Sequence, residues 1–415
     1  MKKPLLMDLF AGCGGLSLGL ENAGFYPIFV NEINDSALGT YLKNRQHINP
    51  LLAEKYHSKD IKEMILSPAY LDDLKAGFRK DYGTDSIDLI VGGPPCQGFS
   101  GIGHRRSYSV EKKQLPSNHL YQDMAYVVGQ IRPKIFLFEN VRGLLSSRWT
   151  KSGEKGEIWE DVKFTFGTIP GYSIRHKLVY AKDYGVPQNR PRILLVGIRD
   201  DLLFSPNDDA KHVAGGFLPN PIRDYPDLKD LLGDLVDSEF NNGGVTEKYP
   251  SAPQNSLQRE LRRDPVTGKT SRKGARLTEQ EYSKHSPHVI EKFSYMIHNN
   301  GKIPPSLKTK KFAQRLLPET WDDRGPTITA TSLPDDYVHF SQPRVPTVRE
   351  WARLQLFPDW YIFKGKRTTG GTRRAGNPLI GDFDRELPKY TQIGNAVPVR
   401  LAEEVGKHFL KILKK

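Results

Sequence analysis

Cysteine is nearly absent from this sequence, in which Cys13 and Cys96 are the only two among 415 residues. Two thiols form neither a disulfide framework nor a metal site built from several sulfur ligands, so no metal is expected. Unpaired thiols are typical of a reducing compartment. The low cysteine count therefore predicts a cytoplasmic protein without structural disulfides.

Long apolar runs are missing as well. No stretch reaches the roughly 18 apolar residues that a membrane-spanning helix needs. The start of the chain becomes acidic at Asp8, too soon for a signal peptide, and it predicts a strand instead. The sequence therefore excludes the membrane-protein class, and no membrane partner is expected.

Acidic residues are too few to balance the basic ones. The chain has 61 Lys and Arg against 48 Asp and Glu, which gives a formal net charge of +13. A surplus of this size predicts a polyanionic partner, and nucleic acid fits better than a membrane surface. Much of the surplus lies in residues 251–311, which contain 13 Lys and Arg but 5 Asp and Glu.

Strand and helix signals alternate through the first half of the chain. Apolar segments predict strands at residues 5–10, 26–30, 87–91, 135–138, 173–179 and 193–198. Helical signals lie at residues 16–21, 34–44 and 122–131. This alternation predicts the α/β class, with a doubly wound, mostly parallel sheet covered by helices on both faces.

The amino-acid composition changes after residue 199, where Pro, Gly, Asn and charged residues are frequent. We expect a first domain at 1–199 and a smaller, loop-rich domain at 200–384, whose core lies at about 200–341. A helical return segment follows at 342–360, then a basic insertion at 361–389. Residues 385–415 end in a helix, about 399–413, that should return to the first domain.

Cys96 lies in the most informative turn of the chain. Apolar residues 87–91 predict a strand, and a Gly-Gly-Pro-Pro run turns the chain directly before the thiol. Glycine permits tight backbone angles and proline stiffens them, so this turn fixes a side chain at a strand end, where open α/β sheets bind ligands. A thiolate there is a candidate nucleophile, and a buried structural cysteine is the alternative.

A glycine-rich turn follows the first predicted strand and contains Phe10, Gly12 and Gly14. A strand, a glycine turn and a helix form the nucleotide-binding arrangement of doubly wound sheets. Glu32 stands 20 residues beyond Gly12, where an acid can accept both ribose hydroxyls. The full dinucleotide fingerprint is missing, which favours S-adenosylmethionine over NAD.

Two further motifs add charged groups. Glu139 comes directly after the apolar run 135–138, at the same predicted sheet edge as Cys96. A carboxyl group beside a nucleophile is suited to proton transfer, although a surface carboxylate or a helix cap would look the same. Arg190 and Arg192 flank a proline before the strand at 193–198, where guanidinium groups suit an oxyanion, a phosphate or a base carbonyl.

In this order, the motifs resemble those of the DNA (cytosine-5)-methyltransferase family of bacterial restriction-modification systems. The matching runs are Phe10-Ala11-Gly12-Cys13-Gly14-Gly15, Pro95-Cys96-Gln97, Glu139-Asn140-Val141, Gln188-Asn189-Arg190-Pro191-Arg192, Arg349-Glu350, Arg353-Leu354-Gln355, Phe357-Pro358-Asp359 and Gln392-Ile393-Gly394-Asn395-Ala396-Val397. They cover about residues 1–198 and 342–412. Residues 200–341 have the position and basic character of the family's target-recognition region.

The resemblance implies transfer of a methyl group from S-adenosylmethionine to carbon-5 of a cytosine in a specific double-stranded DNA sequence. Cys96 would attack carbon-6 of a base that has left the stack, Glu139 would protonate ring nitrogen 3 and Arg192 would hold the carbonyl oxygen at position 2. Asn140, Gln188 and Arg190 would complete the catalytic group. No metal is implied.

The resemblance also implies a cofactor pocket. Phe10 would stack on or near the adenine, Gly12 and Gly14 would lie near the methionine portion, and Glu32 would accept the ribose hydroxyls. The other implied pocket residues are Ile33, Asp60, Ile61, Pro95, Leu120, Asn395 and Val397.

Two features depart from the family pattern. Pro94 stands where many members have a bulkier apolar residue, and the insertion at 361–389 is longer than in compact members. The insertion includes Lys364, Lys366, Arg367, Arg373 and Arg374, with no acid from residue 361 to 380, which suggests additional phosphate contacts.

Other functions stay open on the residues alone. A tRNA cytosine methyltransferase shares the catalytic set, but a long basic segment favours DNA. A catalytically silent DNA-binding relative would not need Cys96, Glu139 and Arg192 together. A nicotinamide oxidoreductase is the weakest alternative. We expect a monomer in the bacterial cytoplasm, associated with the nucleoid through DNA. A restriction endonuclease that cuts the same site is the expected protein partner.

Overall fold

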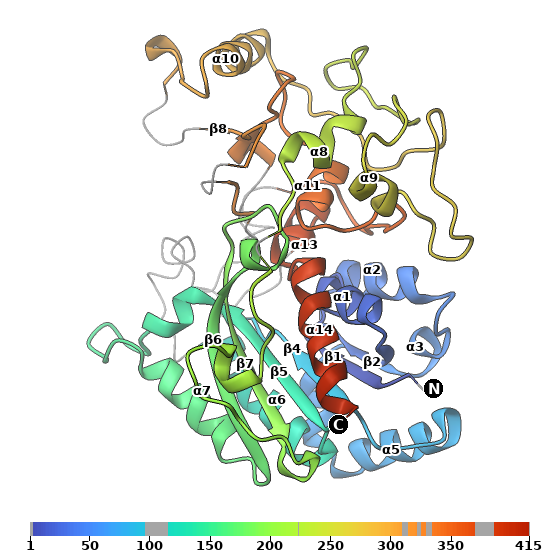
Figure 1. Cartoon of the computed structure of the whole chain (residues 1–415), viewed down its shortest axis with the longest axis vertical. Helices are drawn as coiled ribbons and strands as arrows, with labels where there is room; N and C mark the ends of the chain where they lie inside the picture. The colour runs from blue at the N-terminus through green and yellow to red at the C-terminus, as the bar shows by residue number, and fades with distance from the viewer. Residues whose placement is uncertain are drawn as a thin grey trace.

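The computed structural model describes residues 3–95, 115–222, 224–308, 314–321, 325–328, 334–369 and 386–414. Seven strands form one sheet in the order β3-β2-β1-β4-β5-β7-β6 (Figure 1). They are β1 (Leu5–Leu9), β2 (Tyr26–Asn31), β3 (His57–Ser58), β4 (Leu89–Gly92), β5 (Ile135–Val141), β6 (Tyr172–Tyr180) and β7 (Pro191–Arg199). The predicted doubly wound, mostly parallel sheet is confirmed, and β7 alone runs antiparallel to its neighbours.

Helices cover both faces of the sheet. They are α1 (Gly15–Ala23), α2 (Asp35–Arg45), α3 (Leu51–Glu54), α4 (Ile61–Leu66), α5 (Pro68–Tyr82), α6 (Leu120–Ile131), α7 (Glu157–Gly167) and α14 (Val399–Leu413). Ile135 and Leu137 of β5 face the core shared with α1 and α14, whereas Phe136 and Phe138 face α5, α6 and α7. Burial of both faces explains why the strands are almost entirely apolar.

The strand order places two key loops side by side. Strands β1 and β4 are neighbours, and the order reverses between them, which is the switch point where open α/β sheets bind ligands. Leu9, Gly92 and Phe138 lie level across β1, β4 and β5. The residues that follow them therefore leave the sheet at one edge, with Phe10 and Glu139 on either side of the β4 loop.

The antiparallel direction of β7 has a direct consequence for this edge. Arg192 pairs with Val141, two residues beyond Glu139 on β5. Because side chains alternate along strands, Glu139 and Arg192 project from the same face. A parallel strand would have placed its start at the opposite edge of the sheet.

Residues 200–222 pack back against the sheet, although the sequence suggested a boundary at residue 199. Phe217 is fully buried in the α1–α14 core and meets the ring of Phe204 edge-on. Arg175 of β6 pairs with Asp208 at 3.0 Å. These contacts join residues 204–217 to the sheet and its helices.

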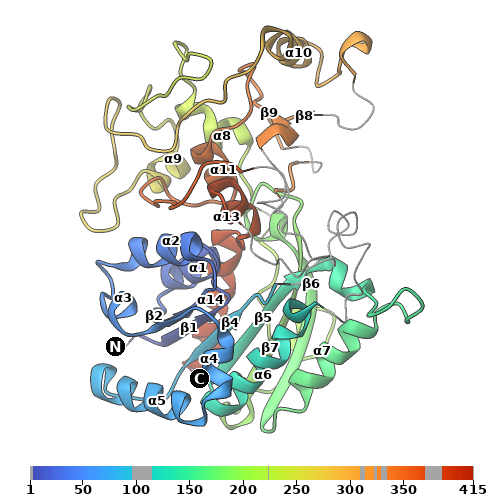
Figure 2. The same cartoon turned by 180° about the vertical axis from the view of Figure 1, so that it is seen from behind.

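The upper half of Figures 1 and 2 contains few regular elements. They are α8 (Leu228–Leu232), α9 (Ser256–Leu261), α10 (Pro287–His298), α11 (Val348–Leu354), α13 (Lys389–Asn395), β8 (Arg315–Leu316) and β9 (Tyr337–Val338). None of the helices in the described ranges has the length and apolar character that crossing a bilayer requires.

Buried charges hold this loop-rich half together. Arg353 of α11 binds Asp359 through Nε and Nη2, at 2.9 and 2.6 Å, and its Nη1 lies 2.5 Å from Asp234. Asp234 also pairs with Arg262 at 2.5 Å. All four groups are buried, so each charge depends on its partners to offset the loss of hydration. Segments far apart in sequence are thereby fixed around α11.

Candidate active site

The glycine-rich loop after β1 has an unusual backbone. Phe10 has a φ of 55°, in the left-handed region that non-glycine residues rarely adopt, and Gly12 follows with a φ of 56°. The N–H of Gly12 donates to Glu32 Oε2 at 2.8 Å. A side-chain carbon built at Gly12 would meet no atom within 4 Å, so this turn borders open space.

Glu32 links the ends of β1 and β2. Its Oε1 accepts from the N–H of Asn34 at 2.8 Å, and its Oε2 accepts from Gly12. Burial raises the pKa of Glu32, while these two N–H groups act in the opposite direction. A carboxylate offers about four acceptor positions, so it can accept hydroxyl groups in addition.

Ile33, the next residue, is 69% exposed. An exposed isoleucine beside an acid and an open glycine turn suits one face of a flat, partly apolar ligand. The chemistry of this corner therefore fits an adenosine group, which needs an acceptor for its ribose and an apolar surface for its base.

Gly14 faces the protein interior. A side chain there would approach Tyr41 to 2.7 Å, Arg45 to 2.8 Å and Tyr361 to 2.9 Å. Arg45 Nη2 donates to the carbonyl oxygen of Gly14 at 3.1 Å, and Tyr361 Oη donates to that of Cys13 at 2.6 Å. Glycine is required here by these side chains, which hold the back of the loop.

The other expected pocket residues differ in exposure. Asp60 caps α4 by accepting from Lys62 N at 2.9 Å, and Ile61 is buried in the core. Pro95 and Asn395 are exposed, Leu120 is half-buried and Val397 is buried. The carbonyl of Val397 lies so close to Gly15 that a side chain there would approach it to 2.5 Å. The segment from residue 395 to 397 thus lies against the start of α1.

Glu139 and Arg192 form a buried ion pair, with Arg192 Nε 2.6 Å from Glu139 Oε1. Burial raises the pKa of Glu139, and the charges of Arg192 and Arg190 counteract this rise. Burial also lowers the pKa of Arg192, opposed by Glu139. The pair thus couples a carboxyl group that favours its proton more than usual with a cation at the sheet edge.

The β4 loop is fixed to this pair. Asn140 Nδ2 donates to the carbonyl of Pro94 at 3.1 Å, and a side chain at Gly93 would approach Glu139 Oε2 to 2.9 Å. Glycine at 93 therefore leaves room for the carboxyl group. Cys96, two residues after Pro94, lies outside the described residues.

Gln188 and Arg190 do not share the partner of Arg192. Gln188 is fully buried, and its Nε2 donates to Gln355 Oε1 at 2.9 Å. Arg190 Nη2 donates to the carbonyls of Gly394 and Ala396, at 2.8 and 3.0 Å. Of the three motif residues, only Arg192 pairs with Glu139. Gln188 binds the return segment at Gln355, and Arg190 binds carbonyl groups at the end of α13 and directly after it.

The comparison with known families covers nearly the whole chain. The model of the C-5 cytosine-specific DNA methylases matches residues 5–411. The chain belongs to this family. The methylase transfers a methyl group from S-adenosylmethionine to carbon-5 of a cytosine in DNA.

Curated relatives agree with this assignment, and a solved structure has the same fold. The methylase is 32% identical to the type II methyltransferase M.DdeI of Desulfomicrobium norvegicum, over 97% of this chain and 87% of the relative. It is 30% identical to M.Eco47II of Escherichia coli, over 99% and 79%. A DNA modification methyltransferase encoded within an E. coli prophage has the same fold, with a TM-score of 0.67, 24% identity and coverage of 99% and 100%.

Sequence reasoning missed several residues that position the site. Neither Tyr361 nor Arg45 was expected from the sequence, and both hold the back of the glycine-rich loop after β1. Asn140, which the resemblance places in the catalytic group, donates to the carbonyl of Pro94 in the β4 loop. Gln355 of the return segment joins Gln188 to α13, because its Nε2 donates to the carbonyl of Ile393 at 2.9 Å. The motif around Gln355 was visible in sequence, but its partners come from residues far along the chain.

Proposed function

We propose that Cys96 forms a covalent bond to carbon-6 of the target cytosine. The addition turns carbon-5 into an enamine carbon that can attack an electrophilic methyl group. Loss of the carbon-5 proton then expels the Cys96 thiolate and restores the aromatic ring. The support is that the loop leading to Cys96 starts beside Glu139 and is tied to β5 through Pro94 and Asn140.

Glu139 protonates ring nitrogen 3 of the cytosine as Cys96 adds. A carboxyl group can do this only if it holds a proton near neutral pH, and burial raises its pKa in that direction. The buried Glu139–Arg192 pair at the edge beside the Cys96 loop is the single observation that carries this mechanism.

Arg192 holds the carbonyl oxygen of the base at position 2. Its Nε is used by Glu139 and its Nη1 by the carbonyl of Pro191, at 2.8 Å, which leaves further N–H donors. A cation there offsets negative charge that develops on the ring during addition. Gln188 and Arg190 act as positioning residues, because their side chains bind the segments that surround this edge.

S-adenosylmethionine supplies the electrophilic methyl group on a sulfonium. Its adenosine portion binds at the open turn of Gly12. The Glu32 carboxylate accepts hydrogen bonds from the ribose, and the exposed side chain of Ile33 packs on the base. Phe10 and Asn395 lie at the same edge of the sheet. Asp60 and Ile61 contribute backbone groups rather than free side chains, because one caps α4 and the other is buried.

The target cytosine leaves the duplex stack, since a thiolate must approach carbon-6 from the ring face. Residues from about 226 to 341 select the DNA sequence, while the sheet and α14 bind cofactor and perform the chemistry. The curated relatives are type II methyltransferases, which supports a partner restriction endonuclease with the same recognition site. We also propose that the enzyme works in the bacterial cytoplasm, on nucleoid DNA.

Two measurements test this proposal. Bisulfite sequencing of plasmid DNA from an expressing host should show one short sequence in which a single cytosine is protected. A duplex with 5-fluorocytosine at that position should trap an adduct whose mass maps to Cys96, because fluorine blocks the final proton loss. Methylation by a Cys96→Ala variant, or an adduct on Cys13, would contradict the covalent role of Cys96.

A further inference from the structure

An irregular antiparallel ribbon projects from the loop-rich half. Tyr249 N donates to the carbonyl of Ala275 at 2.9 Å, and Leu277 N donates to that of Glu247 at 2.7 Å. The chain between these pairs folds into a hairpin at residues 262–271, closed by Ser271 N on the carbonyl of Arg262. We call residues 245–249 and 262–277 the basic ribbon.

The basic ribbon is firmly anchored. Arg262 Nε donates to Asp234 Oδ2 at 2.7 Å, and its guanidinium lies 3.8 Å from the ring centre of Tyr249. At the tip, Asp264 Oδ1 accepts from the N–H of Val266 and Thr267 at 3.0 and 2.7 Å. Such a turn is defined by its own hydrogen bonds, so the ribbon presents its side chains from a fixed backbone.

Six exposed cations lie on this backbone without an ion pair in the described part of the chain. They are Lys248, Arg263, Lys269, Arg272, Lys273 and Arg276. Lys248 and Arg276 face each other across an antiparallel bridge. Like charges directly opposite each other destabilise such a pairing. Of the two acids present, Asp264 is engaged by its turn and Glu247 is exposed. The ribbon thus concentrates positive charge at a cost to its own stability.

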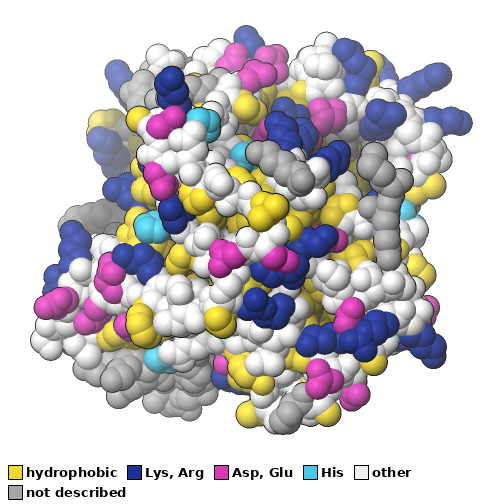
Figure 3. Space-filling model, turned by 60° about the horizontal axis from the view of Figure 1, so that its bottom comes forward, with side chains coloured by type: hydrophobic (Ala, Val, Ile, Leu, Met, Phe, Trp, Pro, Cys, Tyr) yellow, Lys and Arg dark blue, Asp and Glu magenta, His cyan; other side chains and the backbone are white. Residues whose placement is uncertain are grey.

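Two cations of the basic insertion have acidic partners. Lys366 lies 2.7 Å from Glu386, and Arg367 lies 3.5 Å from Glu281. These basic-insertion residues, expected from sequence to bind phosphate, therefore already have acidic neighbours. The face in Figure 3 likewise shows basic and acidic side chains interspersed. The basic ribbon differs from this balanced surface because six cations that are unpaired among the described residues, and only two acids, lie on one short, anchored segment.

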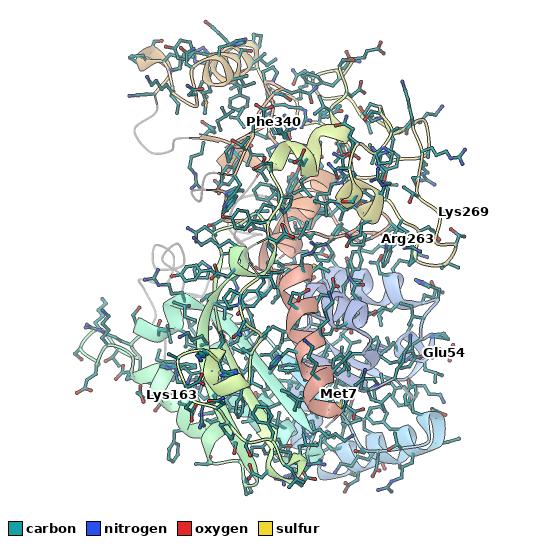
Figure 4. All side chains as sticks on the ribbon, in the orientation of Figure 1. Met7, Glu54, Lys163, Arg263, Lys269 and Phe340 are labelled. Atoms are coloured by element: carbon teal, nitrogen blue, oxygen red, sulfur yellow. The ribbon has the colours of Figure 1, made fainter. Side chains whose placement is uncertain are left out.

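Figure 4 shows Arg263 and Lys269 at the outer edge of the upper half, on the side of Glu54 and opposite Lys163. We propose that the basic ribbon is a phosphate-binding arm that contacts the DNA backbone independently of sequence. DNA is the polyanion that this enzyme must bind, and phosphate contacts provide affinity without base discrimination. The inference rests on the DNA substrate and not on the mechanism proposed for Cys96.

The test removes three charges from the arm, as Lys269→Gln, Arg272→Gln and Lys273→Gln in one variant. The matched control removes three exposed lysines from α5, β6 and α14, as Lys80→Gln, Lys177→Gln and Lys411→Gln. Dissociation constants are measured by fluorescence anisotropy for a duplex with the methylated sequence and for one without it, at salt concentrations from about 50 to 200 mM.

We expect the arm variant to bind both duplexes about 10-fold more weakly at low salt, with an unchanged ratio between them. The slope of log affinity against log salt should become shallower by about one unit for each phosphate that the arm no longer neutralises. Single-turnover methylation at saturating DNA should stay at the wild-type rate. The control variant should bind like the wild type.

Two results would overturn the proposal. Unchanged affinity and salt dependence would mean that the arm does not touch DNA, as expected if it binds an acidic protein surface. A weakening confined to the duplex with the methylated sequence would show that the arm reads bases. A melting temperature equal to that of the wild type would establish that the variant is folded, so that neither result comes from misfolding.

Discussion

The phenol oxygen of Tyr361 lies 2.6 Å from the carbonyl oxygen of Cys13, a residue 348 positions earlier in the chain. The same oxygen accepts from Arg45 Nη1 at 3.0 Å, and Arg45 pairs with Glu21 at 2.6 Å. A side chain from between α11 and α13 therefore holds the back of the glycine-rich loop, through a network in which Tyr361, Arg45 and Cys13 are all buried.

Tyr361→Phe should weaken cofactor binding while leaving DNA binding intact. The variant keeps the buried ring but loses the hydrogen bond to Cys13 and leaves Arg45 one acceptor short. Loss of a buried hydrogen bond costs about 1 to 2 kcal/mol, so we expect a rise of roughly 5- to 30-fold in the dissociation constant for S-adenosylmethionine, measured by titration calorimetry.

Tyr390→Phe provides the matched control. Tyr390 is equally buried, and its hydroxyl donates to the carbonyl of Pro346 at 2.9 Å, away from the cofactor loop. It should lose comparable stability with no change in cofactor affinity. Equal effects of the two substitutions on cofactor affinity would mean that Tyr361 acts through general stability alone.

Arg192→Met should shift the pH dependence of methylation. The charge of Arg192 lowers the pKa of Glu139, so its removal raises that pKa further. If Glu139 is the acid, the single-turnover rate falls as the pH rises through this pKa. The fall should therefore move to higher pH in Arg192→Met, at an overall rate reduced on the order of 100-fold. Glu139→Gln should lack this dependence, and a shift to lower pH would refute the assignment.

Asp8→Asn should flatten the pH dependence of stability. Burial raises the pKa of Asp8 from 3.8 to about 7. The folded state then holds a proton that the unfolded chain has released, so stability falls as the pH rises from about 4 to 7, by at most about 4 kcal/mol. The Ser17 hydroxyl, which donates to Asp8 Oδ2 at 2.5 Å, can donate equally to an asparagine oxygen.

Urea unfolding at about pH 5 and about pH 8 measures this effect. Asp8→Asn should lose less stability than the wild type over this interval. Asp73→Asn, which removes an exposed carboxyl group on α5, should leave the difference unchanged. If Asp8→Asn loses as much stability as the wild type between the two pH values, Asp8 is already ionised in the folded protein.

Cys13 should resist alkylation in the folded protein. It is 1% exposed, and its Sγ lies 3.4 Å from the carbonyl of Gln392. Burial raises the pKa of its thiol to about 12, which removes the reactive thiolate. Peptide mass analysis after iodoacetamide treatment should show modification of Cys13 on the order of 100-fold slower than in urea. Similar rates in both conditions would show that the loop opens readily.

Local patterns were enough to predict the sheet. Strands such as Ile135–Val141 are apolar because both faces are buried, and this pattern is legible in one chain. Helices α2, α6 and α14 were expected, but α4, α5, α7 and α10 were not, since charged residues on their exposed sides mask the apolar spacing. The direction of β7 was also out of reach, because an apolar run does not show which way its strand lies.

The local sequence was enough to identify the charged residues of the site, but not the partners that surround them. Glu139 follows one predicted strand and Arg192 precedes another, so they meet only because β7 is antiparallel, a direction that the sequence does not show. Gln188 and Arg190 share a motif with Arg192, yet their partners are the side chain of Gln355 and main-chain groups of residues 328, 354 and 394–396. The local sequence around Gln188 and Arg190 does not show these distant partners, so it could not predict what positions the two side chains.

The close contact of α1 with α14 has a consequence for synthesis on the ribosome. A side chain at Gly19 would approach the carbonyl of Val399 to 2.2 Å, so the glycine face of α1 is shaped for a helix made about 380 residues later. At about 5 to 20 residues per second, α1 waits roughly 20 to 80 seconds for that cover. A nascent chain therefore cannot assemble its cofactor corner early, and translation must be nearly finished before any DNA can be marked.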